Sequence, residues 1–286
     1  MAKKHRLIIE FCGGFDQGLA LLYALRSPDV QVAGIICRET QSNQCSTLAR
    51  KLIDYAQPGY DISIVPGAKG PLFSGSVDSA SPDGVRFLVE ATRDEDSNLT
   101  LVTFDRLTTL AMAVARDPQL AGKFTRIVVQ GGAIRVPGDV TAIAETNMHG
   151  DPEAAALVLA AGLPFVLVPF DTTKSFQLTE EQVHKLGSLA HSADLIDRTE
   201  ESGVQLAPSE RKLHAWVAMQ AALSPEKMRT EQMKLSVECK SSLSRGAILA
   251  DLRAKPSVGT DTAVCVEVDM AEAKRWLQTV LDQGGQ

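Results

Sequence analysis

The sequence predicts an α/β fold: a single domain with a mostly parallel, twisted central sheet flanked by helices. Short apolar runs alternate with helical patterns along the first two-thirds of the chain, and 44% of the 286 residues are hydrophobic. Strands that alternate with helices form right-handed βαβ units, which place the strands in a parallel sheet. No internal repeat or low-complexity segment divides the chain, so we expect one domain over residues 1–286 although the length would also allow two.

The first predicted strand covers residues 7–11, an apolar run that suits a buried strand. Gly13 and Gly14 then break the run, and Asp16 precedes a helical pattern of leucines. A strand, turn and helix of this kind places Cys12 and Asp16 at the carboxyl end of a parallel strand, where open α/β sheets bind ligands. The alternative is that the glycines only reverse the chain and Asp16 only caps a helix.

The later elements follow the same alternation. Five further apolar runs bounded by turn residues predict strands at residues 32–37, 62–65, 99–102, 127–129 and 165–168. Helical patterns predict helices at residues 45–55, 85–91, 107–115 and 152–161. Two long connections, residues 66–83 and 135–147, are expected to border a pocket.

The C-terminal third has a different pattern. Residues 179–223 are predicted to be helical, and residues 262–268 and 270–281 are predicted to form a late strand and a final helix. The late strand is expected to rejoin the same sheet. The spacing of His184, His191 and His214 matches no close metal pair, so these side chains are interpreted as surface or packing residues.

The composition and charge of the chain argue against a nucleic acid or a membrane as binding partner. Acidic residues outnumber basic ones by 35 to 29, the net charge is −6, and no basic cluster is present, so a nucleic acid is not an expected partner. No stretch approaches the roughly 20 apolar residues of a membrane span, and residues 1–5 lead straight into a strand, so we expect a cytoplasmic protein without a membrane partner. The five cysteines are odd in number and lack Cys-x-x-Cys spacing, which predicts reduced thiols.

Several separated segments match one family in order. Residues 10–18 (Glu-Phe-Cys-Gly-Gly-Phe-Asp-Gln-Gly) correspond to a fingerprint that reads Asp-x-Asp-Pro-Gly-x-Asp-Asp-Ala. Further matches are Leu-Thr-Thr-Leu-Ala at 107–111, Gln-Gly-Gly at 130–132, Ala-Glu-Thr-Asn at 144–147, Asp-Pro-Glu-Ala-Ala at 151–155 and Asp-Thr-Thr at 171–173. The chain therefore resembles the inosine-uridine-preferring nucleoside hydrolases over roughly its first 175 residues, and more weakly at residues 247–256.

The resemblance implies a calcium ion held by carboxylates, with hydrolysis of an N-ribosyl bond by a metal-bound water. Calcium prefers six to eight hard oxygen ligands, and a metal with a carboxylate base makes water nucleophilic. Three of the family's carboxylate positions correspond here to Cys12, Gln17 and Gly246. Because a thiol is a soft ligand and an amide is uncharged, no metal cofactor is expected at these former ligand positions. Calcium remains the expected cofactor if the site functions after all.

The positions of the family's catalytic groups are also altered. Cys12 replaces the carboxylate base, and Arg245 replaces the leaving-group acid, although a guanidinium does not give up its proton at neutral pH. We expect Arg245 to extend toward Asp16 and Glu10 and to supply part of the missing metal's charge. For Cys12, a small buried thiol that closes the former metal cavity is favoured over a catalytic nucleophile.

The sugar-binding positions that the resemblance implies are better preserved. Asp16, Glu145 and Asn147 match family residues that contact ribose, while Asp139 and Gln41 stand where the family has asparagines. Ribose hydroxyls require acceptors and amides of this kind. The alternative is that these side chains are only a polar lining that remains from an ancestral site.

Three functions stay open on the sequence alone. The favoured one is a catalytically silent protein that binds a small ribosyl-containing molecule in the old pocket. The second is an active N-ribosyl hydrolase with an altered metal or base, and the third is a structural or interaction subunit. The resemblance also implies self-association into homo-oligomers.

Overall fold

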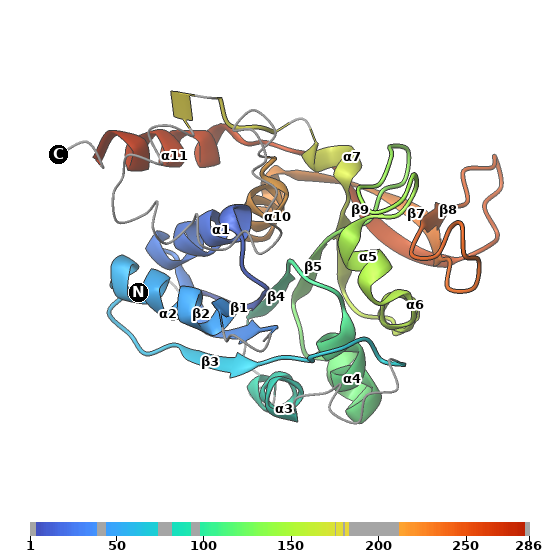
Figure 1. Ribbon diagram of the computed structural model, residues 1–286, viewed down its shortest axis with the longest axis horizontal. Helices are drawn as coiled ribbons and strands as arrows, with labels where there is room; N and C mark the ends of the chain where they lie inside the picture. Colours follow the sequence, from blue (N-terminus) through green and yellow to red (C-terminus); the bar gives the residue numbers. More distant parts are fainter. Residues whose placement is uncertain are drawn as a thin grey trace.

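The computed structural model describes residues 4–38, 44–73, 82–92, 98–174, 176–179, 181–182 and 212–283. Within these residues the chain forms a nine-stranded sheet in the order β3-β2-β1-β4-β5-β6-β9-β7-β8 (Figure 1). The strands are β1 (His5–Phe11), β2 (Val30–Cys37), β3 (Ser63–Pro66), β4 (Leu99–Thr103), β5 (Arg126–Gln130), β6 (Phe165–Val168), β7 (Met228–Val237), β8 (Ile248–Ala250) and β9 (Thr260–Val268).

Helices connect most of the parallel strands. They are α1 (Phe15–Arg26), α2 (Gln44–Ala56), α3 (Pro82–Ala91), α4 (Thr108–Arg116), α5 (Thr146–Gly150), α6 (Pro152–Ala160), α7 (Phe170–Thr173), α10 (His214–Leu223) and α11 (Ala271–Gln283). Two short 3-10 helices, η1 (Pro118–Gly122) and η4 (Pro225–Lys227), complete the described elements. The predicted α/β class with a mostly parallel sheet is therefore confirmed.

Both faces of the sheet are covered, which explains why β1 is apolar without alternation. Leu7, Ile9 and Phe11 pack toward α1, α2, α10 and α11. Ile8 packs on the opposite face with α3, α4 and α6. Figure 1 shows α1 and α10 on one side of the strands and α3 and α4 on the other. Glu10 alternates with Ile9 and Phe11, so its carboxyl group enters the α4 side of the core.

The C-terminal part of the chain extends the sheet as predicted, because β9 pairs with β6 in parallel. The sequence did not predict β7 and β8, which are antiparallel to each other, with β7 also antiparallel to β9. The first half of β7 is polar and exposed, so it lacks the apolar run by which the buried strands were recognised.

The helical prediction for residues 179–223 is tested only in part. Its last portion forms α10, whereas residue 180 and residues 183–211, with His184 and His191, lie outside the described residues. In the portion of the chain that the structure describes, no helix is both long enough and apolar enough to cross a membrane.

The order of the strands creates a crevice at one end of the sheet. β1 pairs with β2 on one side and with β4 on the other. The connection after β1 leads to β2 and the connection after β4 leads to β5, so the two run in opposite directions along the sheet. At such a switch point the loops after the strands separate and leave room for a ligand. Residues that follow β1, β2, β4 and β5 therefore meet at one place.

Candidate functional site

A cavity of about 340 Å³ lies at the carboxyl ends of β1, β4 and β5. This volume is at the lower end of the range for small-molecule sites. Six of the predicted site residues line it together: Cys12, Asp16, Gln17, Asp139, Glu145 and Asn147. They come from two segments that are far apart in sequence, the turn after β1 and the connection after β5. The structure thus places these residues around one cavity.

The turn after β1 folds Gln17 back over Cys12. Gly13 and Gly14 have φ angles of +95° and +96°, a backbone region that glycine adopts without steric cost. The Cys12 backbone N–H donates to Oε1 of Gln17 at 2.9 Å. Nε2 of Gln17 in turn donates to Sγ of Cys12 at 3.2 Å and to the Phe104 carbonyl oxygen at 3.0 Å. The Gln17 amide therefore uses both its donor and its acceptor groups on its own neighbours.

This set of donors does not fit calcium. Burial raises the pKa of the Cys12 thiol to about 12, so the sulfur is neutral at physiological pH. Gln17 directs N–H groups, which repel a cation, toward Cys12 and Phe104. Among the described residues, no group of three or more His, Cys, Asp and Glu side chains is arranged to hold a metal ion.

Gly246, the third position at which the resemblance implies a calcium carboxylate, has no room for a side chain. Gly246 has a φ angle of +82°, and a Cβ atom there would lie 2.4 Å from Cα and 2.8 Å from N of His149. Both atoms belong to the backbone and cannot rotate away. A carboxylate side chain at this position would require the loop before β8 to move, so the position is restricted to glycine in this fold.

The prediction for Arg245 was wrong. Its guanidinium forms a two-pronged ion pair with Glu153 of α6, through Nη1 to Oε1 and Nη2 to Oε2, both at 2.7 Å. It also donates to the Cys239 carbonyl and does not line the cavity. The fork of a guanidinium matches a carboxylate geometrically, and Glu153 offers one nearby at a partly exposed site, without the desolvation that entry into the cavity would require.

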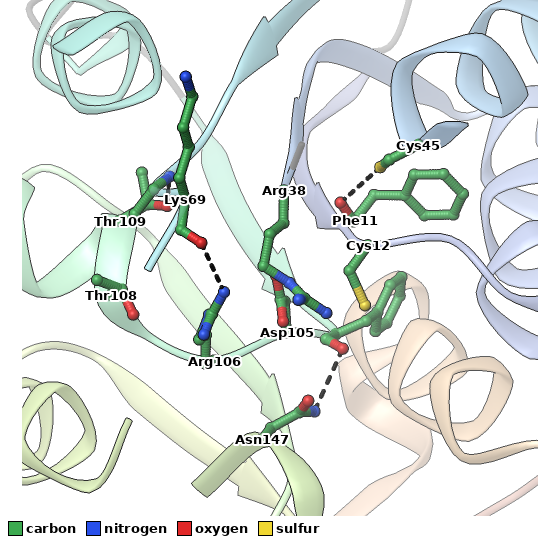
Figure 2. Close-up of polar contacts among 12 residues, drawn as sticks. Phe11, Cys12, Arg38, Cys45, Lys69, Asp105, Arg106, Thr108, Thr109 and Asn147 are labelled. Carbon is green, nitrogen blue, oxygen red and sulfur yellow. Dashed lines mark hydrogen bonds and ion pairs between the residues drawn. The ribbon is translucent and has the colours of Figure 1, made fainter. Parts of the chain in front are cut away.

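Arg38, which directly follows β2, supplies the positive charge at the cavity instead. Its Nε donates to Oδ2 of Asp105 at 2.6 Å, and its guanidinium also hydrogen-bonds the Cys12 thiol. Figure 2 shows the guanidinium between Asp105 and Cys12. Burial lowers the pKa of Arg38, but Asp105 and Cys12 more than offset this, so the pKa lies above its ordinary value.

Sequence reasoning missed Arg38, Asp105 and Arg106, all of which line the cavity. A usable signal was present: Arg38 comes directly after one predicted strand, and Asp105 and Arg106 come soon after another. The carboxyl ends of parallel strands lie at the same edge of a sheet, so charged residues at these places are expected to converge.

Glu10 of β1 is a second buried carboxyl group, close enough to Asp105 and Arg38 for their charges to act on it. Glu10 is only 2% exposed, and none of the residues that the structure describes hydrogen-bonds its Oε2. Burial, and then the nearby Asp105, raise the pKa of Glu10 to about 7, although hydrogen bonds from Thr109 and Thr103 oppose the shift. Glu10 is therefore largely protonated at slightly acidic pH.

Asp16 has a structural partner that lies far away in the sequence. Its Oδ2 and Oδ1 accept the backbone N–H groups of Ala215 and Trp216, at 2.5 and 3.0 Å, in the first turn of α10. Burial raises the pKa of Asp16 to about 7, while these hydrogen bonds lower it. Asp16 thus caps a helix, as one sequence interpretation held, but the helix is α10 and not the adjacent α1. A carboxylate has about four acceptor sites, so it can still accept hydroxyl groups from the cavity.

The connection after β5 supplies the other polar groups. Oε2 of Glu145 accepts N–H groups from Gly132 at 2.8 Å and Met148 at 3.2 Å, and burial raises the pKa of Glu145 to about 7. Nδ2 of Asn147 donates to the Phe104 carbonyl at 3.2 Å. Asp139 accepts from the N–H and hydroxyl groups of Thr146. Gln41, the remaining predicted sugar-binding residue, lies outside the described residues.

His214 also differs from its interpretation as a surface or packing residue, because it lines the cavity. Its ring stacks on Phe170 with a centroid distance of 4.1 Å, and it hydrogen-bonds Thr173. Burial, and then Lys212, lower the pKa of His214 to about 4, so the ring is neutral at pH 7. Nothing in its sequence neighbourhood indicated that it meets the turn after β1.

Comparison with known proteins agrees with this fold and with these motifs. The chain is 27% identical to the pyrimidine-specific ribonucleoside hydrolase RihA of Salmonella choleraesuis, a match that covers 92% of this chain and 94% of the relative. It is also 27% identical to uridine nucleosidase 1 of Arabidopsis thaliana, over 66% of this chain and 63% of that protein's length.

A solved structure supports the fold independently. The purine-preferring ribonucleoside hydrolase from Gardnerella vaginalis superposes with a TM-score of 0.80 at 23% identity, covering 98% of both chains. In addition, the family profile described as inosine-uridine preferring nucleoside hydrolase matches residues 7–275. The chain belongs to the inosine-uridine-preferring nucleoside hydrolase family.

Proposed function

We propose that this protein binds a small ribosyl-containing molecule in the cavity and does not carry out calcium-dependent N-ribosyl hydrolysis. The observation that carries the proposal is the Gln17 amide, which bonds Cys12 and Phe104 where the family places metal-binding carboxylates. With a neutral thiol at Cys12 and no room for a side chain at Gly246, three anionic ligands are absent together. Calcium affinity depends on the number of charged ligands, so it is expected to fall steeply.

The sugar-binding side supports retained binding. Asp16, Asp139, Glu145 and Asn147 still surround an open cavity, and each presents oxygen acceptors suited to vicinal hydroxyl groups. The family acts on ribosyl-containing small molecules, and two of the relatives are named for uridine and for pyrimidine ribonucleosides. Uridine and ribose are therefore suitable first probes.

A hydrolase that works without metal is the second candidate, because Asp16 lines the cavity with a pKa raised to about 7 by burial. A carboxylate with a pKa near the working pH is a suitable general base for water. This candidate requires release of the base from uridine or inosine in the presence of EDTA.

Binding can be tested by thermal denaturation with ribose, uridine and inosine in EDTA. A ligand that binds only the folded state raises the melting temperature. Asp139→Ala removes an exposed cavity carboxylate, and we expect it to weaken ribosyl binding roughly tenfold, the cost of about one hydrogen-bonding group. The adjacent Val140→Ala is the matched control, because Val140 is 48% exposed and does not line the cavity.

Catalysis is tested by measuring the release of reducing sugar from uridine and inosine, with calcium and with EDTA. We expect binding without release under both conditions. Calcium-dependent turnover would refute the proposal, and turnover in EDTA would select the metal-free hydrolase. If no ribosyl compound shifts the melting temperature, the third possibility, a structural or interaction subunit, replaces both.

Assembly and location are separate proposals. The family resemblance supports self-association, which sedimentation of the purified protein tests directly. The acidic net charge of −6 supports the absence of a nucleic-acid partner, and the sequence pattern supports a cytoplasmic location without a membrane partner.

A further inference from the structure

We propose that the ligand of this cavity carries a phosphate group: a ribosyl phosphate whose phosphate lies against Arg38 and Arg106. This inference rests on the proposed ribosyl binding and specifies the ligand further. Arg38 and Arg106 both line the cavity, and we refer to this pair as its basic end.

The two arginines enter from opposite sides of β1. Arg38 follows β2, Arg106 follows β4, and both strands pair with β1, which ends just before Cys12. The side chains are close enough to repel: burial, and then the charge of Arg38, lower the pKa of Arg106. Two guanidinium groups that converge on one cavity are a recurring way to bind a phosphate, because each offers a fork of N–H donors to the anion.

Arg106 is incompletely satisfied by the protein. Its Nη2 donates to the Lys69 carbonyl at 3.0 Å, as Figure 2 shows. Its Nε is buried and has no hydrogen-bond partner among the described residues. A buried N–H of a charged group without an acceptor is costly, and an anionic ligand is one way to satisfy it.

The carboxylates near the basic end compensate Arg106 only in part. Asp105 forms its ion pair with Arg38, and the charges of Asp105 and Asp151 raise the pKa of Arg106 by less than burial and Arg38 lower it. The adjacent Cys12 thiol is neutral, because burial raises its pKa to about 12. Burial likewise raises the pKa of Glu10 to about 7, so Glu10 provides a full negative charge only above neutral pH. A phosphate would supply both an acceptor for the buried Nε of Arg106 and further negative charge beside it.

The segment after β5 contributes acceptors to the cavity lining. Asp139, Glu145 and Asn147 come from this segment, which contains no basic residue that lines the cavity. A ribosyl phosphate carries a matching pair of groups, an anion and vicinal hydroxyl groups along the ring. Ribose 5-phosphate and uridine 5′-monophosphate share this chemistry, and the experiment distinguishes between them.

The test is titration calorimetry in EDTA with ribose, ribose 5-phosphate, uridine, uridine 5′-monophosphate and inorganic phosphate. We expect ribose 5-phosphate to bind more tightly than ribose, or uridine 5′-monophosphate to bind more tightly than uridine. Arg106→Gln should weaken binding of that phosphorylated ligand by on the order of tenfold to a hundredfold, as expected for hydrogen bonds to a charged group. The same variant should weaken binding of the unphosphorylated partner by a much smaller factor.

Two variants serve as controls. Arg106→Lys keeps the charge but loses the fork, and it should recover part of the affinity. Arg116→Gln removes one positive charge from an exposed position on α4 that does not line the cavity, and it should change no affinity. The melting temperature of each variant without ligand shows whether the fold is intact.

The outcomes separate this inference from the proposed function. Equal affinity for phosphorylated and unphosphorylated ligands, or an Arg106→Gln variant that binds ribose 5-phosphate normally, overturns the phosphate assignment while ribosyl binding stands. If inorganic phosphate alone binds as tightly as ribose 5-phosphate, the sugar contributes nothing and the ribosyl assignment fails. Absence of binding for all five compounds overturns both proposals.

Discussion

At the scale of single residues, contacts between protein groups hold the cavity floor together. Gln17 supplies donors to Cys12 and Phe104, and Arg38 supplies positive charge beside Asp105. Without these contacts, buried polar groups would be left unpaired, at a cost of about 1–3 kcal/mol each. Glu10 is a buried carboxyl group whose Oε2 has no partner within the described part of the chain, and we expect it to make the fold sensitive to pH.

Glu10 is expected to make the protein less stable as pH rises. Burial raises its pKa from 4.5 to about 7 in the folded state, so the folded chain holds the proton more tightly than the unfolded chain. Stability from this group is complete below pH 4.5 and falls as pH rises to about 7, by on the order of 3 kcal/mol.

Denaturant unfolding of the unmodified protein and of Glu10→Gln between pH 4.5 and 8 tests this expectation. The variant should lose less stability over this range, while Asp16 and Glu145 retain their share of the pH dependence. Glu90→Gln, an exposed substitution on α3, should behave as the unmodified protein does. Parallel pH profiles for Glu10→Gln and the unmodified protein would show that Glu10 does not contribute.

At the scale of elements, Asp16 joins the start of α1 to the start of α10. The carboxylate accepts two N–H groups that have no partner within α10, and its charge is favourable at a helix N-terminus. The same first turn of α10 carries His214 into the cavity. The position of one cavity wall therefore depends on a contact between residues that are 199 positions apart.

Asp16→Asn should weaken this contact. The amide replaces one acceptor oxygen with a donor and removes the charge, so we expect a loss of stability of about 1–2 kcal/mol, the usual cost of a lost helix cap. Hydrogen exchange should quicken at Ala215 and Trp216 more than in α4. Asp29→Asn, at an exposed turn before β2, should have no effect. Unchanged exchange in α10 would show that the cap is not needed.

At the scale of the whole molecule, one sheet connects two core layers. β1, β4 and β5 contribute to both layers, so neither layer has a set of strands of its own. A fold of this kind is expected to unfold as a unit, because loss of either helical layer exposes strands that the other layer still needs.

This predicts a single unfolding transition in guanidinium chloride. Tryptophan fluorescence reports the layer that contains Trp216 and Trp276, while far-ultraviolet circular dichroism reports all helices and strands. The two probes should give coincident midpoints. Separate midpoints would show that the layers are independent units and would contradict a single cooperative domain.

The apolar pattern of the sequence predicted strands correctly where both faces of a strand are buried, because burial requires apolar residues there. The apolar runs of β1, β2, β4, β5 and β6 were recognisable because both of their faces are covered. β7 was missed because its exposed residues are polar. Asp16, Glu145 and Asn147 were identified through motifs, but Arg38 and Arg106 belong to no recognised motif, and their convergence depends on strand order.

The sequence by itself determined the α/β class, the family resemblance and the absence of a carboxylate side chain at positions 12, 17 and 246, because these follow from residue type and spacing. Only the tertiary structure decided which charges meet. It paired Arg245 with Glu153 outside the cavity, and it brought Arg38, Arg106 and His214 to the cavity. The physical reason is that a long charged side chain takes the nearest geometrically matched partner, and which partner is nearest depends on packing across the sheet.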